Sequence, residues 1–248
     1  ENYRPDVCEP VRGTYRGYDI VSSPPPASGV QVIEILNTLE GFECAALEHG
    51  EAPYVELLAR AIKLSFIDRA RYLSDPRFQD VPVDLFLSKD RAAKLRARIE
   101  RRDALDEEGG GPPESPHTTH VNVVDGEGNC VSLTHTLGSA SGVVTPGLGF
   151  TYNNCMYQFD PLPGRPNSIR PGKARITGMS PAIVFSEGRP FLVVGAPGGT
   201  RILGAVAHTI LNVIDHGMTA VEAVSAPRWH WEAATVDIEP RRYYHVRD

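Results

Sequence analysis

The chain is poor in the features that mark membrane, nucleic-acid-binding and metal-binding proteins. Its 248 residues contain no apolar run of about 18 residues, the length that spans a bilayer. Lysine and arginine total 25 against 31 acidic residues, and the net charge of −6 argues against a nucleic-acid-binding surface. The four cysteines form no Cys-x-x-Cys pair and lack zinc-type spacing to histidine: Cys8, Cys44, Cys130 and Cys155. We therefore expect no metal, no organic cofactor, no nucleic acid and no membrane span, and we expect Cys130 to be a buried free thiol.

What remains is the composition of an ordinary globular protein. Hydrophobic residues make up 41% and charged residues 23%, and the length allows one large domain or two small ones. The chain begins at Glu1 rather than Met, so we expect any leader or earlier portion to have been removed already. Neither observation decides the cellular compartment. A periplasmic or extracellular location and a cytoplasmic location both remain possible.

Apolar spacing of three and four residues predicts several amphipathic helices, at 30–37, 51–73, 89–102 and 201–215. Ser88 is suited to cap the third of them. Thr219 and Glu222 form a capping-box pattern that opens a further short helix, and this helix should stop before Pro227.

Alternating and β-branched segments predict strands, mainly in the second half. Residues 11–22 are extended, and two hairpins are expected, one pairing 119–125 with 130–136 and the other pairing 182–185 with 191–194. Hairpins together with amphipathic helices indicate the α+β class, with helices packed on the outer faces of stacked antiparallel sheets.

The segment 103–117 divides the chain. It holds three consecutive glycines, three prolines and five acidic residues, so it cannot contribute to a core. We expect an exposed linker in which a chain break is tolerated, between a first region at 1–102 and a second at 118–248. Composition by itself is equally consistent with a plain interdomain linker.

A strand that starts with threonine follows this linker directly. A threonine hydroxyl is a poor nucleophile unless a base lies beside it. A break between His117 and Thr118 would supply that base as the new α-amino group, whose unperturbed pKa is roughly 7.7–8.0. Thr118 would then carry both the nucleophile and the base. The alternative is an ordinary hairpin strand, in which threonine is common.

Several motifs, in this order and spacing, make nearly the whole chain resemble the γ-glutamyltransferase (glutathione hydrolase) family of N-terminal nucleophile hydrolases. The segments that carry the resemblance are Pro24–Gly29, Ile35–Glu40, Thr118–His120, Gly128–Leu137, Asn153–Asn154, Gly178–Pro181, Gly195–Ile202, Leu211–Asp215 and Glu222–Arg228.

The resemblance implies a fold and a set of catalytic residues. The fold would be the four-layer αββα sandwich, with 1–102 as the end of a large subunit and 118–248 as the small subunit. Thr118 would be the nucleophile, released when a zymogen cleaves itself after His117. Thr136 would orient the nucleophile, and Gly198 and Gly199 would form the oxyanion hole.

Each of these residues has a plainer explanation. Thr136 is also an ordinary strand residue, and a Gly-Gly pair is also a tight strand-to-helix turn. His120 and His135 lie on the paired strands, but the α-amine already fills the role of base. We expect Arg201 to brace the start of its helix rather than to touch substrate.

The positions that bind the glutamyl group in the family depart from its pattern. Gly138 stands where the family has Asn, and the residues that hold the substrate's α-amino group are replaced by the neutral Cys155 and Gln158. The serine pair that contacts the α-carboxylate is replaced by Thr177 and Gly178. A clamp on an ammonium group needs a carboxylate, so we expect a less polar pocket and an acyl group without the α-amine. The family includes relatives that act on cephalosporin side chains and oxamate.

Family members are considerably longer, and the arginine that grips the substrate carboxylate lies in the portion missing here. The expected partners are therefore a small amide, γ-glutamyl or not, and that N-terminal large-subunit portion. The leading hypothesis is an autoprocessed amidohydrolase or acyltransferase. The competing hypothesis is an inactive truncated remnant that serves as a structural or binding partner.

Overall fold

The computed structural model describes residues 4–105 and 118–239. Most of the expected linker 103–117, including His117 at the expected cleavage site, lies outside the described residues. Along the chain the elements with helical structure are α1 (Gly29–Leu39), a 3-10 turn (Cys44–Ala46), α2 (Ala52–Tyr72), α3 (Val83–Leu87), α4 (Lys89–Glu100), a second 3-10 turn (Cys155–Gln158), α5 (Arg201–Ile214) and α6 (Ala220–Ser225). The strands are β1 (Val11–Tyr15), β2 (Tyr18–Ser22), β3 (Thr118–Val124), β4 (Cys130–Thr136), β5 (Ala182–Ser186), β6 (Arg189–Val194), β7 (Trp229–Trp231) and β8 (Val236–Ile238).

An antiparallel sheet of four strands, in the order β1-β2-β5-β6, forms the centre. The tight turn at Arg16 and Gly17, both with positive φ, joins β1 to β2. Ile20 on β2 pairs with Val184 on β5, so two strands from before the linker join two from after it. The two regions on either side of 106–117 therefore share one sheet.

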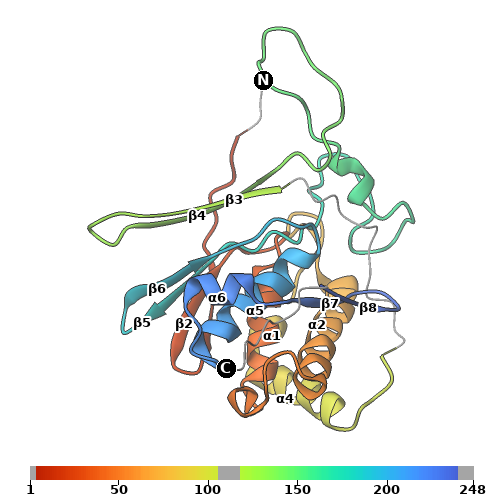
Figure 1. The fold of residues 1–248 in the computed structure, drawn as a ribbon. Helices are drawn as coiled ribbons and strands as arrows, with labels where there is room; N and C mark the ends of the chain where they lie inside the picture. The colour runs from red at the N-terminus through yellow and green to blue at the C-terminus, as the bar shows by residue number, and fades with distance from the viewer. Residues whose placement is uncertain (1–3, 106–117, 240–248) are drawn as a thin grey trace.

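Helices α1, α2 and α5 cover one side of this sheet (Figure 1). Every residue of α1 is buried, because the helix lies between the sheet and the other helices. The apolar stripe of α5 supplies buried Ile202, Leu203, Val206 and Ile210 to the same core. This core makes the helix layer and the sheet a single packed unit.

The expected helix signals are confirmed at their ends. Ser88 caps α4 by accepting a hydrogen bond from the backbone N–H of Arg91. Thr219 and Glu222 form the capping box of α6, which ends before Pro227. The short helix α3 and the three-residue strands β7 and β8 were not expected, because elements this short show no measurable periodicity.

The hairpin β3–β4 lies on the side of the sheet away from the helices (Figure 1). Its inward face is polar and includes Ser132, whose hydroxyl donates to the carbonyl of Val194 on β6. Its outward face is apolar: Val121 opposite Leu133 and Val123 opposite Val131, each exposed by 47 to 55%. The prediction that Cys130 is buried was wrong, since this strand end lies beside the exposed hairpin turn and the thiol is half-buried.

The α+β class is confirmed, with layers in the order helices, four-stranded sheet and hairpin. A fourth layer over the outward face of the hairpin is not formed by residues 4–105 and 118–239, where that face is open to solvent. Across the same residues, no helix is both long enough and apolar enough to cross a bilayer.

Candidate active site

The two threonines singled out by the sequence face each other across the hairpin. Thr118 pairs with Thr136 in the β3–β4 register, and its hydroxyl donates to the Thr136 hydroxyl at 3.1 Å. The oxygen of Thr136 also accepts the backbone N–H of Gly138 at 3.0 Å. The Gly138 N–H fixes the Thr136 hydroxyl, which in turn orients the oxygen of Thr118. This is the arrangement expected for a nucleophile and its positioning group.

A pocket of about 420 Å³ opens beside this pair. Its lining carries two positive charges and no carboxylate: Thr136, Asn153, Cys155, Met156, Phe159, Lys173, Ala174, Arg175, Thr177 and Met179. Arg175 lies 3.5 Å from the sulfur of Cys155 through Nη2. Lys173 donates to the carbonyls of Pro166 and Ser168, and burial together with the charge of Arg170 lowers the pKa of its ammonium group. The pocket is therefore suited to an apolar or anionic group rather than to an ammonium group.

The glycine pair lies in the turn between β6 and α5, as the sequence predicts. Gly198 and Gly199 have φ of +129° and +66°, a conformation that favours glycine. Their carbonyls accept the N–H groups of Arg201 and Ile202 at the start of α5.

This turn is packed tightly against the segment that borders the pocket. A Cβ atom added to Gly178 would lie 2.4 Å from the carbonyl oxygen of Gly199. Gly178 immediately follows Thr177, which lines the pocket with Thr136. The fold thus brings Thr136, Thr177, Gly178 and the glycine turn into one region, although they are far apart in the sequence.

The two strand histidines have no hydrogen bond to Thr118. His120 binds the hydroxyl of Thr134 and the amide oxygen of Asn122 through its ring nitrogens, and its ring packs against Gly195. His135 lies on the outward face of the hairpin and is exposed. These positions leave the role of base to another group.

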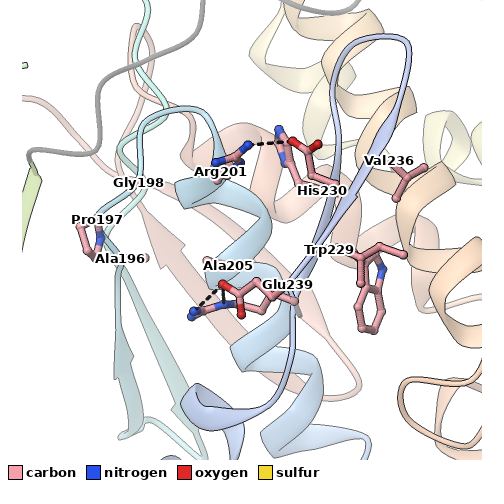
Figure 2. Close-up of a pocket in the computed structure, with 12 residues that line it drawn as sticks. Ala196, Pro197, Gly198, Arg201, Ala205, Trp229, His230, Val236 and Glu239 are labelled. Atoms are coloured by element: carbon pink, nitrogen blue, oxygen red, sulfur yellow. Dashed lines mark hydrogen bonds and ion pairs between the residues drawn. The ribbon is translucent and has the colours of Figure 1, made fainter. Parts of the chain in front are cut away.

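A second pocket, of about 690 Å³, lies between α5 and the β7–β8 hairpin (Figure 2). It shares no lining residue with the first pocket, and Gly198 is on its border. Arg201 binds Asp237 at 2.7 Å across its edge, which ties the first turn of α5 to β8. Arg201 thus braces the helix start, as expected. Within the described ranges, no group of three or more His, Cys, Asp or Glu side chains is arranged to hold a metal ion.

Comparison with known proteins shows the family of the chain. Residues 1–248 match the family model described as Gamma-glutamyltranspeptidase. The chain belongs to the gamma-glutamyltranspeptidase family. It is 45% identical over 242 residues to the acylase ACY 1 proenzyme of Pseudomonas sp. (strain V22), covering 96% of this chain and 43% of that protein. It is 38% identical over 239 residues to the glutathione hydrolase proenzyme of Escherichia coli (strain K12), covering 89% of this chain and 41% of that protein.

A solved structure of the family resembles the fold. The cephalosporin acylase from Bacillus halodurans superposes with a TM-score of 0.85 at 31% identity, over 96% of this chain and 44% of that chain. The chain therefore spans less than half the length of the gamma-glutamyltranspeptidase relatives that it matches.

The first position at which the sequence is expected to depart from the family pattern is closely packed in the structure. Gly138 has φ of +64°, and a Cβ atom there would lie 2.2 Å from the side-chain oxygen of Asn154. That oxygen accepts the N–H of Ser139 at 2.8 Å and so holds the loop. The side chain of Asn154 thus occupies the space that a larger residue at position 138 would need.

The other predicted substrate residues divide into two groups. Cys155 and Thr177 line the pocket. Gln158 is only 6% exposed, does not line the pocket, and accepts a hydrogen bond from Asn167 through its backbone carbonyl. Gly178 contributes a backbone contact rather than a side chain.

Sequence reasoning missed the two pocket cations. Lys173 and Arg175 are close in sequence to the predicted substrate residue Thr177. Their proximity was a usable signal, but only the fold shows that both side chains border the same pocket.

Proposed function

We propose that this chain is the nucleophile-bearing portion of an autoprocessed amidohydrolase or acyltransferase of the gamma-glutamyltranspeptidase type. The observation that carries the proposal is the hydroxyl pair of Thr118 and Thr136, with Thr136 on the wall of the pocket. The family match supports the same chemistry, because the relatives are named as acylase and glutathione hydrolase proenzymes.

The reaction follows from the placement of these groups. Once the chain is cleaved after His117, the oxygen of Thr118 attacks the carbonyl carbon of an amide and its proton passes to the new α-amine. The negative oxygen of the tetrahedral intermediate takes hydrogen bonds in the glycine turn at Gly198 and Gly199. When the intermediate collapses, the C–N bond breaks and the leaving amine takes the proton, which leaves an acyl ester on Thr118. Water or an acceptor amine then attacks this ester while the α-amine removes its proton. The bond between the acyl carbon and the Thr118 oxygen breaks, the acid or new amide leaves, and the α-amine returns the proton to the Thr118 oxygen.

The pocket supports an acyl group without an α-ammonium group. Its lining offers Lys173 and Arg175 but no carboxylate, and it includes the neutral Cys155, which the family resemblance places where the substrate's amino group would bind. A small non-glutamyl amide, of the cephalosporin-acylase or oxamate-amidohydrolase kind, is therefore the preferred substrate class. A γ-glutamyl amide is the second candidate, favoured by the relatives named glutathione hydrolase.

Intact mass separates an active enzyme from an inactive remnant. Two forms of the protein are incubated at neutral pH: these 248 residues alone and the protein at its full natural length. The Thr118→Ala variant of each form is incubated in parallel. We expect two fragments divided between His117 and Thr118, and none from the variant. The Thr119→Ala variant is the matched control and should cleave normally, because its side chain is on the outward face. An uncleaved wild-type protein would favour the remnant hypothesis.

Substrate class is tested with a γ-glutamyl anilide and with acyl anilides that lack the α-amine, either neutral or ending in a carboxylate. We expect faster release of the aniline from the acyl anilides. The Arg175→Met variant should slow release mainly from the carboxylate-bearing anilide, because it removes a pocket charge. Preference for the γ-glutamyl anilide would instead support glutathione-hydrolase activity.

We further propose that the outward face of the β3–β4 hairpin packs against the N-terminal large-subunit portion carried by the longer relatives. The exposed pairs Val121–Leu133 and Val123–Val131 form an apolar surface that a soluble hairpin would otherwise present to water. Covering them would add the fourth layer of the αββα sandwich. Regions 1–102 and 118–248 would then be the end of a large subunit and the small subunit, joined by the linker 103–117.

This packing is tested by substitution on the apolar face. In the full-length protein, Leu133→Thr should lower the yield of assembled, cleaved enzyme, measured by size exclusion and intact mass. Val224→Thr, at an equally exposed apolar position on α6, is the control and should assemble normally. Equal yields from both variants would contradict the proposed interface.

A further inference from the structure

A buried arginine on α2 anchors a chain of hydrogen bonds that reaches the wall of the pocket. Arg69 is only 6% exposed, and its Nη1 donates to the hydroxyl of Ser28 at 2.7 Å and to the amide oxygen of Gln31 at 3.0 Å. Its guanidinium group also lies over the ring of Phe66. A buried charge is costly unless it is paired and hydrogen-bonded, so the position of Arg69 calls for an account.

The first link runs from Arg69 through Ser28. Ser28 is at the N-cap of α1, yet its side chain does not cap that helix. Its hydroxyl donates instead to the carbonyl of Thr177 at 2.5 Å, and its backbone N–H donates to the carbonyl of Met179 at 3.0 Å. Thr177 in turn donates its N–H to the carbonyl of Pro26. The segment 177–179 is thereby bound at both ends to the turn before α1.

The glycine turn is held at its other end by Glu232. The carboxylate of Glu232 accepts the hydroxyl of Thr200 at 2.6 Å and lies 3.2 Å from Nε2 of His230. Burial raises the pKa of this carboxyl, but the hydrogen bonds from His230 and Thr200 and the nearby charge of Arg69 lower it below its ordinary value. Glu232 thus holds Thr200, the residue after Gly199, in place.

We propose that Arg69 is a positioning residue for the reaction proposed above, on which this inference rests. Through Ser28 it fixes the segment 177–179, and the contact of Gly178 with Gly199 transmits that position to the glycine turn, which Glu232 holds from its other end through Thr200. These two segments meet where Gly178 touches Gly199. Arg69 therefore sets the distance between the pocket wall and the turn that would hold the oxyanion.

An arginine suits this role better than a lysine. Its planar guanidinium presents several N–H groups in fixed directions, so one side chain can hold both Ser28 and Gln31. A lysine would keep the buried charge, but its compact ammonium group cannot reproduce that fork. Arg69→Lys consequently separates geometry from charge.

Kinetics at the full natural length of the protein test the positioning role. The variants are Arg69→Lys and Ser28→Ala, the second of which removes one link without touching the buried charge. Arg71→Lys, on the same helix but exposed, is the matched control. We expect both test variants to lower kcat for an anilide substrate and the rate of self-cleavage by about 10- to 100-fold, because displacement by about 1 Å has costs of that order. KM should change little, and the control should match the wild type.

A merely structural role would give a different pattern. Thermal unfolding shows whether each variant is folded at the assay temperature, and amide hydrogen exchange reports on the two loops. We expect faster exchange at both 177–179 and 198–200 in Ser28→Ala and Arg69→Lys. Wild-type kcat in folded variants, or unchanged exchange in either loop, would overturn the proposal. A folded wild-type protein that neither cleaves itself nor acts on any amide would contradict the proposed function. It would not decide the positioning role, because hydrogen exchange in the variants still reports whether Arg69 holds both loops.

Discussion

Gly178 and Gly199 touch backbone to backbone, with the site of a Cβ atom on Gly178 only 2.4 Å from the carbonyl oxygen of Gly199. Gly178 does not have a positive φ, so its backbone would accept other residues. Glycine is required there because the neighbouring turn approaches so closely. The contact joins the segment beside the pocket to the turn that we assign to the oxyanion.

Gly178→Ala should therefore displace the glycine turn rather than unfold the protein. We expect kcat to fall by about 10- to 100-fold, since small displacements of catalytic groups have costs of that order. Gly126→Ala is the matched control, because nothing lies within 4 Å of a Cβ atom at that position. Steady-state kinetics compare the kcat of both variants with that of the wild type, and thermal melts show whether both variants are folded. A normal kcat in Gly178→Ala would show that the contact is not functional.

The hydroxyl of Thr136 should matter for rate more than for stability. Thr136→Val removes the group bonded to Thr118 and keeps the shape of the side chain. We expect self-cleavage and turnover to slow by about 10- to 100-fold, and Thr136→Ser to restore most of the rate. Thr134→Val, on the same face of the same strand, serves as the control because its hydroxyl binds His120 instead. Similar losses in both valine variants would point to general damage to the hairpin.

An asparagine at position 138, the residue that the resemblance implies for the family, should harm this protein. In Gly138→Asn the new side chain meets Asn154, whose oxygen lies 2.2 Å from the added Cβ atom. We expect a lower melting temperature and slower turnover. Gly142→Asn isolates the backbone cost, because Gly142 has φ of +75° but open space around it. Equal melting temperatures for the two variants would mean that Asn154 moves aside without cost.

Mild acid should destabilise the packing of α5 against β7. His208 is fully buried, its ring lies 4.6 Å from that of Trp229, and its Nδ1 donates to the carbonyl of Gly204. Burial lowers the pKa of His208 from 6.5 to about 3. At pH values between these two pKa values, the histidine is protonated in the unfolded chain but neutral in the folded chain. Between pH 7 and pH 5, His208 should therefore lower the free energy of unfolding by about 2 kcal/mol.

The His208→Gln variant tests this pH dependence, since glutamine is neutral and keeps a donor for Gly204. Urea unfolding at the two pH values should show a smaller loss in His208→Gln than in the wild type. His135→Gln replaces an exposed histidine and should retain the wild-type loss. The same loss in all three proteins would contradict the assignment to His208.

The sequence by itself determined the local elements and the family. Apolar periodicity located α2, α4 and α5, and short-range cap patterns placed Ser88 and the capping box at Thr219. These features depend on residues within a few positions of one another, so they can be read along the chain. The hairpin itself was also predicted, but the register that places Thr118 opposite Thr136 was given by the structure.

Only the tertiary structure decided how distant segments meet. Strands from both sides of 106–117 share one sheet, and the contact between Gly178 and Gly199 sets the pocket wall against the turn at α5. The support from Arg69 and the charge that Arg175 brings to the pocket depend on the same long-range packing. No local pattern encodes these approaches, since they arise from burial of the shared core around α1 rather than from the preferences of neighbouring residues.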